Sequence, residues 1–96
     1  MYKELDPLLH SQLRLSIVSI LMTMDKADFI FIKESTKAAA GNISIQIKKL
    51  QDAGYIKVEK SFKNNYPNTT ISITKKGIKA FEEYVNNLKK YIHPQS

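Results

Sequence analysis

The chain has 96 residues, with fifteen Lys and Arg against nine Asp and Glu and no cysteine. This length suits a single domain over residues 1–96, and a hydrophobic content of 43% with few Gly and Pro indicates a folded core. The lack of cysteine excludes disulfide frameworks, cysteine-zinc sites and cysteine nucleophiles. No apolar stretch is long enough to span a bilayer and no signal peptide is evident, so we expect no membrane partner and a cytoplasmic location.

The formal net charge of +6 favours an acidic partner. Of the fifteen cationic residues only Arg14 is an arginine, and lysine does not form the planar, bidentate contacts that arginine makes with bases and phosphates. Contacts with nucleic acid are therefore expected to be mostly with the phosphate backbone.

The first predicted helix follows Ser11, a suitable N-cap residue, and reaches about Met24. Its apolar residues fall on two faces. One face carries Leu13, Ile17, Ile20, Leu21 and Met24, and the roughly opposite face carries Leu15, Val18 and Met22. Because one small core can cover only one of these faces, we expect the second face to contact another copy of the chain.

The next segment predicts two short helices joined by a tight turn. Residues 25–28 are polar and turn-like, and Asp28 can cap a helix from Phe29 to about Thr36. Residues 29–32 also suit a strand, so periodicity leaves both interpretations open. A turn then leads into a helix over about 40–53, which Gly54 ends as a left-handed C-cap residue.

After Gly54 the apolar period changes to two, which predicts a β-hairpin. Ile56, Val58 and Phe62 alternate with polar residues, and Lys60 interrupts the pattern. Turn-forming residues then predict a loop of about six residues before a second strand over 70–74.

Thr74 is suited to cap a last helix over about 75–92, ended by His93 and Pro94. Apolar side chains repeat along one side of this helix at spacings of three and four. The residues expected to complete a homodimer interface with the first helix are Phe81, Tyr84, Val85, Leu88, Tyr91 and Ile92. Packing within the chain is the alternative explanation for this stripe.

The order of these elements predicts an α+β, mainly α, winged helix-turn-helix with a two-stranded β-hairpin wing and a C-terminal dimerisation helix. Residues 50–56, Leu-Gln-Asp-Ala-Gly-Tyr-Ile, and residues 74–77, Thr-Lys-Lys-Gly, resemble motifs of small winged-helix regulators related to the MarR and ArsR families. The start of the chain, residues 5–11 with Arg14, is similar to the start of the same regulators. The resemblance covers roughly residues 5–92 and implies a dimeric, DNA-binding transcriptional regulator, most simply a repressor.

Two features depart from the family pattern. Ala39 stands where a Ser or Thr cap is usual before the recognition helix, and the wing has Lys and Asn where Arg is common. The resemblance therefore implies a weaker phosphate grip at the wing.

On the predicted recognition helix, Ile43, Ile47 and Leu50 share the face that should pack on the core. The opposite face and its flanks offer hydroxyl, amide and lysine groups to base edges or phosphates, and an isoleucine to a thymine methyl. We expect DNA contacts from Asn42, Ser44, Ile45, Gln46, Lys48 and Lys49 in this helix, and from Lys63, Asn64, Asn65, Asn68 and Thr69 in the wing. A solvated helix face without a DNA role is the alternative.

Other function classes have less support. No phosphate-binding loop, dinucleotide-binding turn, nucleophile elbow or metalloprotease motif is present, so we expect neither an enzyme nor a cofactor. Only His10 and His93 are available as imidazole ligands, which leaves a site bridging two subunits as the remaining metal hypothesis. Two functions stay open: a winged-helix module for protein–protein or architectural contacts, favoured by Ile45, and a regulator that responds to a small-molecule effector.

Overall fold

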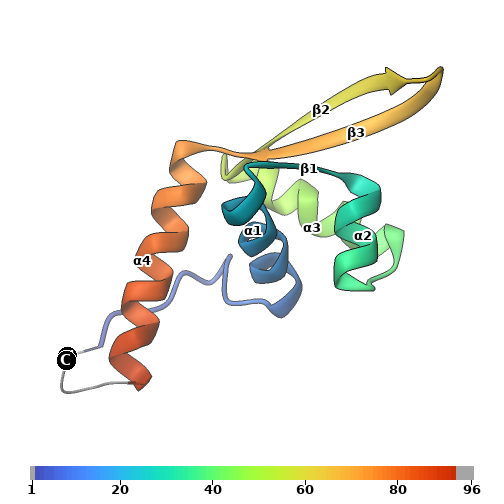
Figure 1. The fold of residues 1–96 in the computed structure, drawn as a ribbon. Coiled ribbons are helices and arrows are strands. Elements are labelled where there is room, and N and C mark those ends of the chain that lie inside the picture. Colours follow the sequence, from blue (N-terminus) through green and yellow to red (C-terminus); the bar gives the residue numbers. More distant parts are fainter. Residues whose placement is uncertain (1, 93–96) are drawn as a thin grey trace.

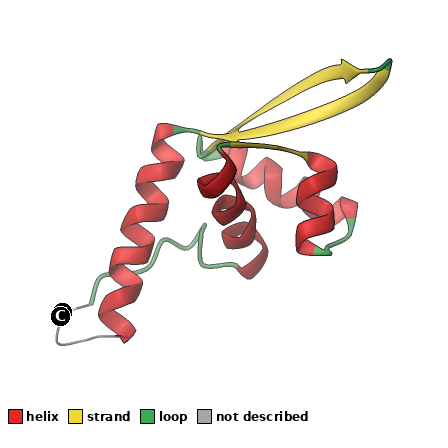
Figure 2. Cartoon of the chain, viewed as in Figure 1, coloured by secondary structure: helices red, strands yellow, loops and turns green. Residues whose placement is uncertain are grey.

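The computed structural model describes residues 2–92, which form four helices and three strands (Figure 1, Figure 2). The elements in chain order are α1 (Gln12–Met24), β1 (Lys26–Asp28), α2 (Phe29–Thr36), α3 (Ala40–Asp52), β2 (Ile56–Lys63), β3 (Tyr66–Ile73) and α4 (Lys75–Ile92). The mainly helical winged helix-turn-helix predicted from the sequence is confirmed. No helix within residues 2–92 has the length and apolar character needed to cross a membrane. The predicted helix end at His93 and Pro94 lies outside the described residues.

Side-chain caps explain where three of the helices begin. The Ser11 hydroxyl accepts from the backbone N–H of Arg14, and the Asp28 carboxylate accepts from the backbone N–H of Phe31 at 2.7 Å. The Thr74 hydroxyl likewise accepts from the N–H of Gly77, in the first turn of α4. The cap at Asp28 decides between the two interpretations of residues 29–32, which form a helix.

The core surrounds α1, which contacts the other three helices as well as β1 and β3 (Figure 2). Its buried hydrophobic residues are Leu9, Ile17, Val18, Leu21, Ala27, Ile32, Ile43, Ile47, Leu50, Ile56, Ile71 and Tyr84. Each large aliphatic side chain buried in this way contributes about 1.5–3 kcal/mol to the free energy of folding. The helix-turn-helix pair α2–α3 is thereby held on a rigid support.

The sheet has three strands, one more than the sequence predicted. β3 lies between β2 and β1, and all pairings are antiparallel. The segment expected to be a turn is β1, whose Ala27 pairs with Ile71 and is buried. A strand of three residues is too short to show a recognisable alternation of apolar and polar side chains. Only its pairing with β3, far along the chain, identifies it as a strand.

The wing loop is also shorter than predicted. β2 and β3 are joined by Asn64 and Asn65 alone, both with left-handed φ angles, of 53° and 67°. Two consecutive residues with positive φ are characteristic of a type I′ turn, in which asparagine is favoured. The strands consequently extend into the predicted loop. Phe62, which continues the apolar alternation of β2, lies beyond the core and is 77% exposed.

The N-terminal segment runs beside the outer part of α4 (Figure 1). The Tyr91 hydroxyl donates to the backbone oxygen of Lys3 at 3.0 Å, and the ring of Tyr91 stacks on that of Tyr2. The radius of gyration is 14.6 Å, above the value of about 12.5 Å expected for a compact chain of this length. The excess arises because α4 and the wing project from the core in different directions.

Candidate nucleic-acid interface

α3 has an anchored face and an exposed face, as predicted. Ile43, Ile47 and Leu50 are buried and fix the helix to the core. Ser44, Ile45, Lys48 and Lys49 are all exposed on the remaining surface, as is Asn42 in the first turn. The exposed face combines a hydroxyl, an amide and two ammonium groups with Ile45, which is 56% exposed. These groups can reach base edges and phosphates if the helix enters a major groove.

Lys48 has an acidic neighbour on the same helix. Its ammonium group lies 2.6 Å from the carboxylate of Asp52, and both side chains are more than half exposed. An exposed pair at this spacing contributes about 0.3–0.5 kcal/mol to helix stability. So weak an interaction allows Lys48 to exchange the carboxylate for a DNA phosphate.

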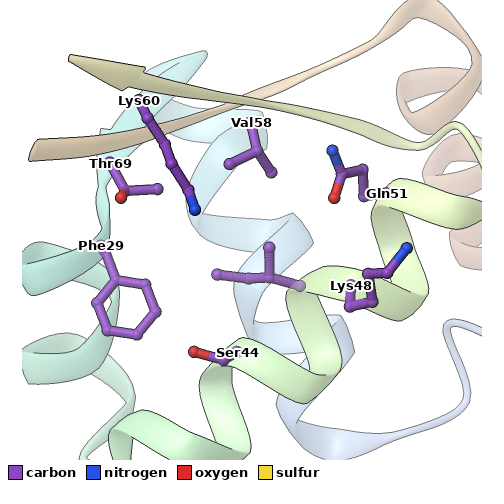
Figure 3. A pocket seen from close by; sticks show the side chains of 8 residues that line it. Phe29, Ser44, Lys48, Gln51, Val58, Lys60 and Thr69 are labelled. Carbon is purple, nitrogen blue, oxygen red and sulfur yellow. The ribbon is translucent and has the colours of Figure 1, made fainter.

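A hollow of about 360 Å³ lies between α3, the start of α2 and the inner face of the wing (Figure 3). Its lining residues are Phe29, Ser44, Ile47, Lys48, Gln51, Val58, Lys60 and Thr69. Lys60 and Thr69 are directly opposite each other on β2 and β3, so both point to this inner face. The hollow joins the exposed face of α3 to the wing in one surface that carries two lysines.

The predicted wing residues do not share one face. Thr69 points into the hollow, whereas Lys63 and Asn68 lie on the outer face because strand residues alternate between the two sides. The Asn68 amide donates to the Thr70 hydroxyl at 3.3 Å, along that outer face. Asn64 and Asn65 form the exposed tip. A single approach of DNA to the inner face would therefore leave part of the predicted set without contact.

Gln46 and Asn42 are held by neighbours within the chain. Arg14 donates from Nη1 to Gln46 Oε1 at 2.6 Å, and Gln46 donates from Nε2 to Asn42 Oδ1 at 2.9 Å. Gln46 is partly buried, while Asn42 is exposed. Both amides thus lie in the N-terminal half of α3, with orientations fixed by a contact from α1.

The predicted dimer surface is smaller than expected. Val18 is fully buried in the core of its own chain and Tyr84 is only 5% exposed, so neither side chain offers a surface to a second subunit. Val18 is covered because α1 is central to the fold and packs on several sides. Tyr84 belongs to the buried core cluster, and its hydroxyl is hydrogen-bonded to Nδ1 of His10 in the N-terminal segment, at 3.0 Å.

The remaining residues predicted for the dimer interface are still partly or largely accessible. Phe81, Val85 and Met22 line a hollow of about 330 Å³ between α4 and α1, and Leu15 lines a separate one between α1 and α2. Leu88 is partly buried, whereas Tyr91 and Ile92 are 46% and 62% exposed. An apolar stripe thus continues along α4 to its end.

His10 does not belong to a cluster of metal-binding side chains within residues 2–92. His10 is engaged with Tyr84, and no group of three or more potential ligands occurs within residues 2–92. His93 lies outside those residues.

The pKa of the Tyr55 hydroxyl is clearly shifted. Burial raises the pKa of its hydroxyl from 10.0 to about 12, helped by the hydrogen bond that it donates to Asp6 at 2.5 Å and by the charges of Asp6 and Glu83. Tyr55 follows α3 and precedes β2, so this contact ties the N-terminal segment to the base of the wing.

Sequence reasoning missed two residues of this surface. Arg14 stood in the motif at the start of the chain, but its hydrogen bond to Gln46 could not be predicted because the two residues lie 32 positions apart. Lys60 did give a signal, since it interrupts the apolar alternation of β2 at a position that should face inward. A cation on the inner face of a strand next to the exposed side of α3 indicates a binding role more strongly than a cation on the outer face does.

Both the sequence and the fold of this chain are similar to those of known proteins. The family model described as a winged helix DNA-binding domain matches residues 13–92. An uncharacterized protein of Methanocaldococcus jannaschii is 32% identical over 76 residues, which cover 79% of this chain and 83% of that protein.

Solved structures agree with that match. A transcriptional regulator homologue from Pyrococcus horikoshii OT3 superposes with a TM-score of 0.83 at 28% identity, covering 88% of this chain and 84% of that one. A mutant of MarR from E. coli, complexed with operator DNA, has a TM-score of 0.72 at 14% identity, which shows a shared fold. That match covers 91% of this chain and 61% of the MarR chain.

Proposed function

The chain belongs to the winged helix DNA-binding domain family, and on this premise we propose that it is a regulator related to MarR, and not an enzyme, that represses transcription as a homodimer on duplex DNA. In this proposal α3 enters the major groove and the wing contacts the flanking backbone. Repression follows most simply if the bound dimer occludes a promoter.

The observation that carries the proposal is the continuous surface formed by α3 and the inner face of the wing. Three buried aliphatic residues hold α3 on the core, so its polar groups face outward without needing to reorganise. Lys48 and Lys60 border the same hollow, and the net charge of +6 attracts a polyanion to it. Affinity would come from neutralised phosphates, and sequence preference from the few groups that reach base edges.

Dimerisation would use the exposed stripe of α4 with the C-terminal end of α1. Phe81 and Val85 line one hollow with Met22, and Ile92 continues the stripe in an exposed position. A second copy packed there would bury apolar side chains that the core of one chain leaves accessible. Two recognition helices could then contact two half-sites, one helical turn apart.

Fluorescence anisotropy tests the proposal with a duplex from upstream of the protein's own gene and a shuffled duplex of equal length, each at two salt concentrations. We expect a preference of about a thousandfold or more for the upstream duplex. Equal affinities for this pair, followed by a genome-wide selection that enriches no sequence, would overturn sequence-specific regulation.

The double substitution Lys48→Ala and Lys60→Ala locates the DNA surface, because both lysines border the hollow between α3 and the inner face of the wing. Both residues are placed to neutralise phosphates, so binding should weaken at every sequence. The slope of log affinity against log salt should flatten by about 0.9 for each phosphate that the variant no longer neutralises. Unchanged operator binding by the folded double variant would show that the surface is assigned wrongly.

The second candidate function is a winged-helix module for protein–protein or architectural contacts. It is favoured by Ile45, whose exposed side chain on α3 suits an apolar partner as well as a thymine methyl. Such a module would bind all duplexes equally and with a steep dependence on salt. A small-molecule effector stays a prediction, with the hollows beside α1 as the places to seek one.

A further inference from the structure

Arg14 connects three parts of the chain through its guanidinium group. Its Nε donates to the backbone oxygen of Leu8 at 2.6 Å, which ties it to the N-terminal segment. Its Nη1 donates at the same distance to Oε1 of Gln46 on α3. Because the guanidinium is planar and its donors are fixed relative to one another, the two contacts together set the position of the Gln46 amide.

The chemistry of these groups also sets the direction of the hydrogen bonds. Arginine only donates, so the Gln46 amide must turn its oxygen toward Arg14 and its nitrogen away. The nitrogen then donates to Oδ1 of Asn42 at 2.9 Å. The Nδ2 group of Asn42 is therefore the outer end of this series of hydrogen bonds. Within residues 2–92 that Nδ2 group has no hydrogen-bond acceptor, and Asn42 is exposed.

The backbone at the same end of α3 offers donors of the same kind. Ala39 occupies the N-cap position and makes no side-chain hydrogen bond to the first turn. The backbone N–H groups of the first turn of a helix have no partner within the helix and carry a partial positive charge. The first turn thus presents amide donors from the backbone and from one oriented side chain.

We propose that Arg14 is a positioning residue of the DNA site, which acts through Gln46 to turn the Nδ2 group of Asn42 outward as a donor to DNA. The partner is a hydrogen-bond acceptor, either a phosphate oxygen or a base oxygen in the major groove, O6 of guanine or O4 of thymine. This inference rests on the proposed function, since it requires α3 to face DNA.

The substitution Gln46→Glu tests the direction of the contacts. A carboxylate at position 46 still accepts from Arg14 but cannot donate, so Asn42 must turn its Nδ2 group inward and its oxygen outward. If the partner is a phosphate, affinity should fall about three- to tenfold at every sequence, the value of one hydrogen bond. If the partner is a base, selection from a random duplex pool should shift at one position from G or T toward A or C.

The matched control is Gln12→Glu, which makes the same chemical and charge change at an exposed position at the start of α1. It should reproduce only the general repulsion between one added negative charge and DNA. Arg14→Lys is the second variant, because a single ammonium keeps the charge but cannot hold the fork geometry. It should weaken binding by a similar factor without altering the salt dependence.

The side-chain amide signals of the free protein in nitrogen-15 NMR report the same contacts without DNA. The Gln46 signals should show slow hydrogen exchange relative to those of Gln12, and the Asn42 signals should move in the Gln46→Glu variant but not in the control. Equal effects of the two glutamate variants on DNA binding and on these signals would overturn the inference. Failure of the unaltered protein to bind any duplex would overturn the proposed function and this inference together, even with the NMR pattern intact.

Discussion

Gly77 lies where α4 begins to cross the connection between α3 and β2. A Cβ atom at this position would stand 2.2 Å from the backbone oxygen of Tyr55 and 3.0 Å from Cγ1 of Ile73. Neither a backbone oxygen nor a packed strand residue can move away easily, so glycine is required by a close approach of two segments. The glycine of the Thr-x-x-Gly pattern at residues 74–77 therefore allows the first turn of α4 to pack closely against the core.

The substitution Gly77→Ala should lower the free energy of unfolding by about 1–3 kcal/mol, the usual cost of forcing extra volume into a packed site. Gly41→Ala is the control, since no atom lies within 4 Å of its added Cβ and alanine stabilises a helix by up to about 1 kcal/mol. Urea denaturation of both variants measures the difference. Equal midpoints for the two would show that the close approach at Gly77 is tolerated.

The contact between Tyr55 and Asp6 predicts a loss of stability at high pH. The pKa of the Tyr55 hydroxyl is about 12 in the folded chain against its ordinary value of 10.0. A raised pKa means that the folded state holds the proton more tightly, so this contribution is complete below pH 10 and disappears as the pH rises toward 12. Tyr55→Phe should remove this part of the pH dependence and cost about 1 kcal/mol at neutral pH. Denaturation of both proteins across the alkaline range measures how the free energy of unfolding depends on pH. The same pH dependence in the variant as in the unaltered chain would contradict the raised pKa of Tyr55.

At the scale of single elements, the helices could be predicted because their signals are local. Caps at Ser11, Asp28 and Thr74 and apolar periodicity placed their limits close to those of the structure. β1 could not be predicted, because its strand character comes from pairing with β3. The exposed face of α3 followed from periodicity, whereas the link from Arg14 to Gln46 depends on how two helices pack.

The wing tip shows how a turn sets the register of a hairpin. The turn-forming residues after β2 predict a wing loop of about six residues. The loop in the structure needs only two, Asn64 and Asn65, because both have left-handed φ angles. Asn65→Gly should raise the free energy of unfolding by up to about 1 kcal/mol, because glycine takes up this conformation without the penalty that a side chain brings. Asn68→Gly, within β3, should instead lower it by about 0.5–1 kcal/mol. Thermal melts that change in the same direction for both variants would contradict the two-residue turn.

At the scale of the whole molecule, the projecting α4 gives the proposed dimer its clearest test. Val85 is partly exposed beside Phe81 and Met22, and a carboxylate buried there on association would be costly. Val85→Glu should therefore yield a monomer at concentrations where the unaltered chain is dimeric, as measured by sedimentation equilibrium. Lys90→Gln, an equal change in charge at an exposed position of α4, should leave the association state unchanged.

Binding to half-sites separates the loss of a dimer from the loss of a fold. A winged helix contacts one half-site through its own α3 and wing, so monomeric Val85→Glu should bind an isolated half-site as well as the unaltered chain does. On a full site, two linked recognition helices bind with a high effective concentration for the second contact, which the monomer lacks. Its affinity for the full site should fall at least about a hundredfold. Equal losses on half-site and full site would instead mean that α4 supports the DNA-binding surface itself, and would remove this variant as support for a dimer.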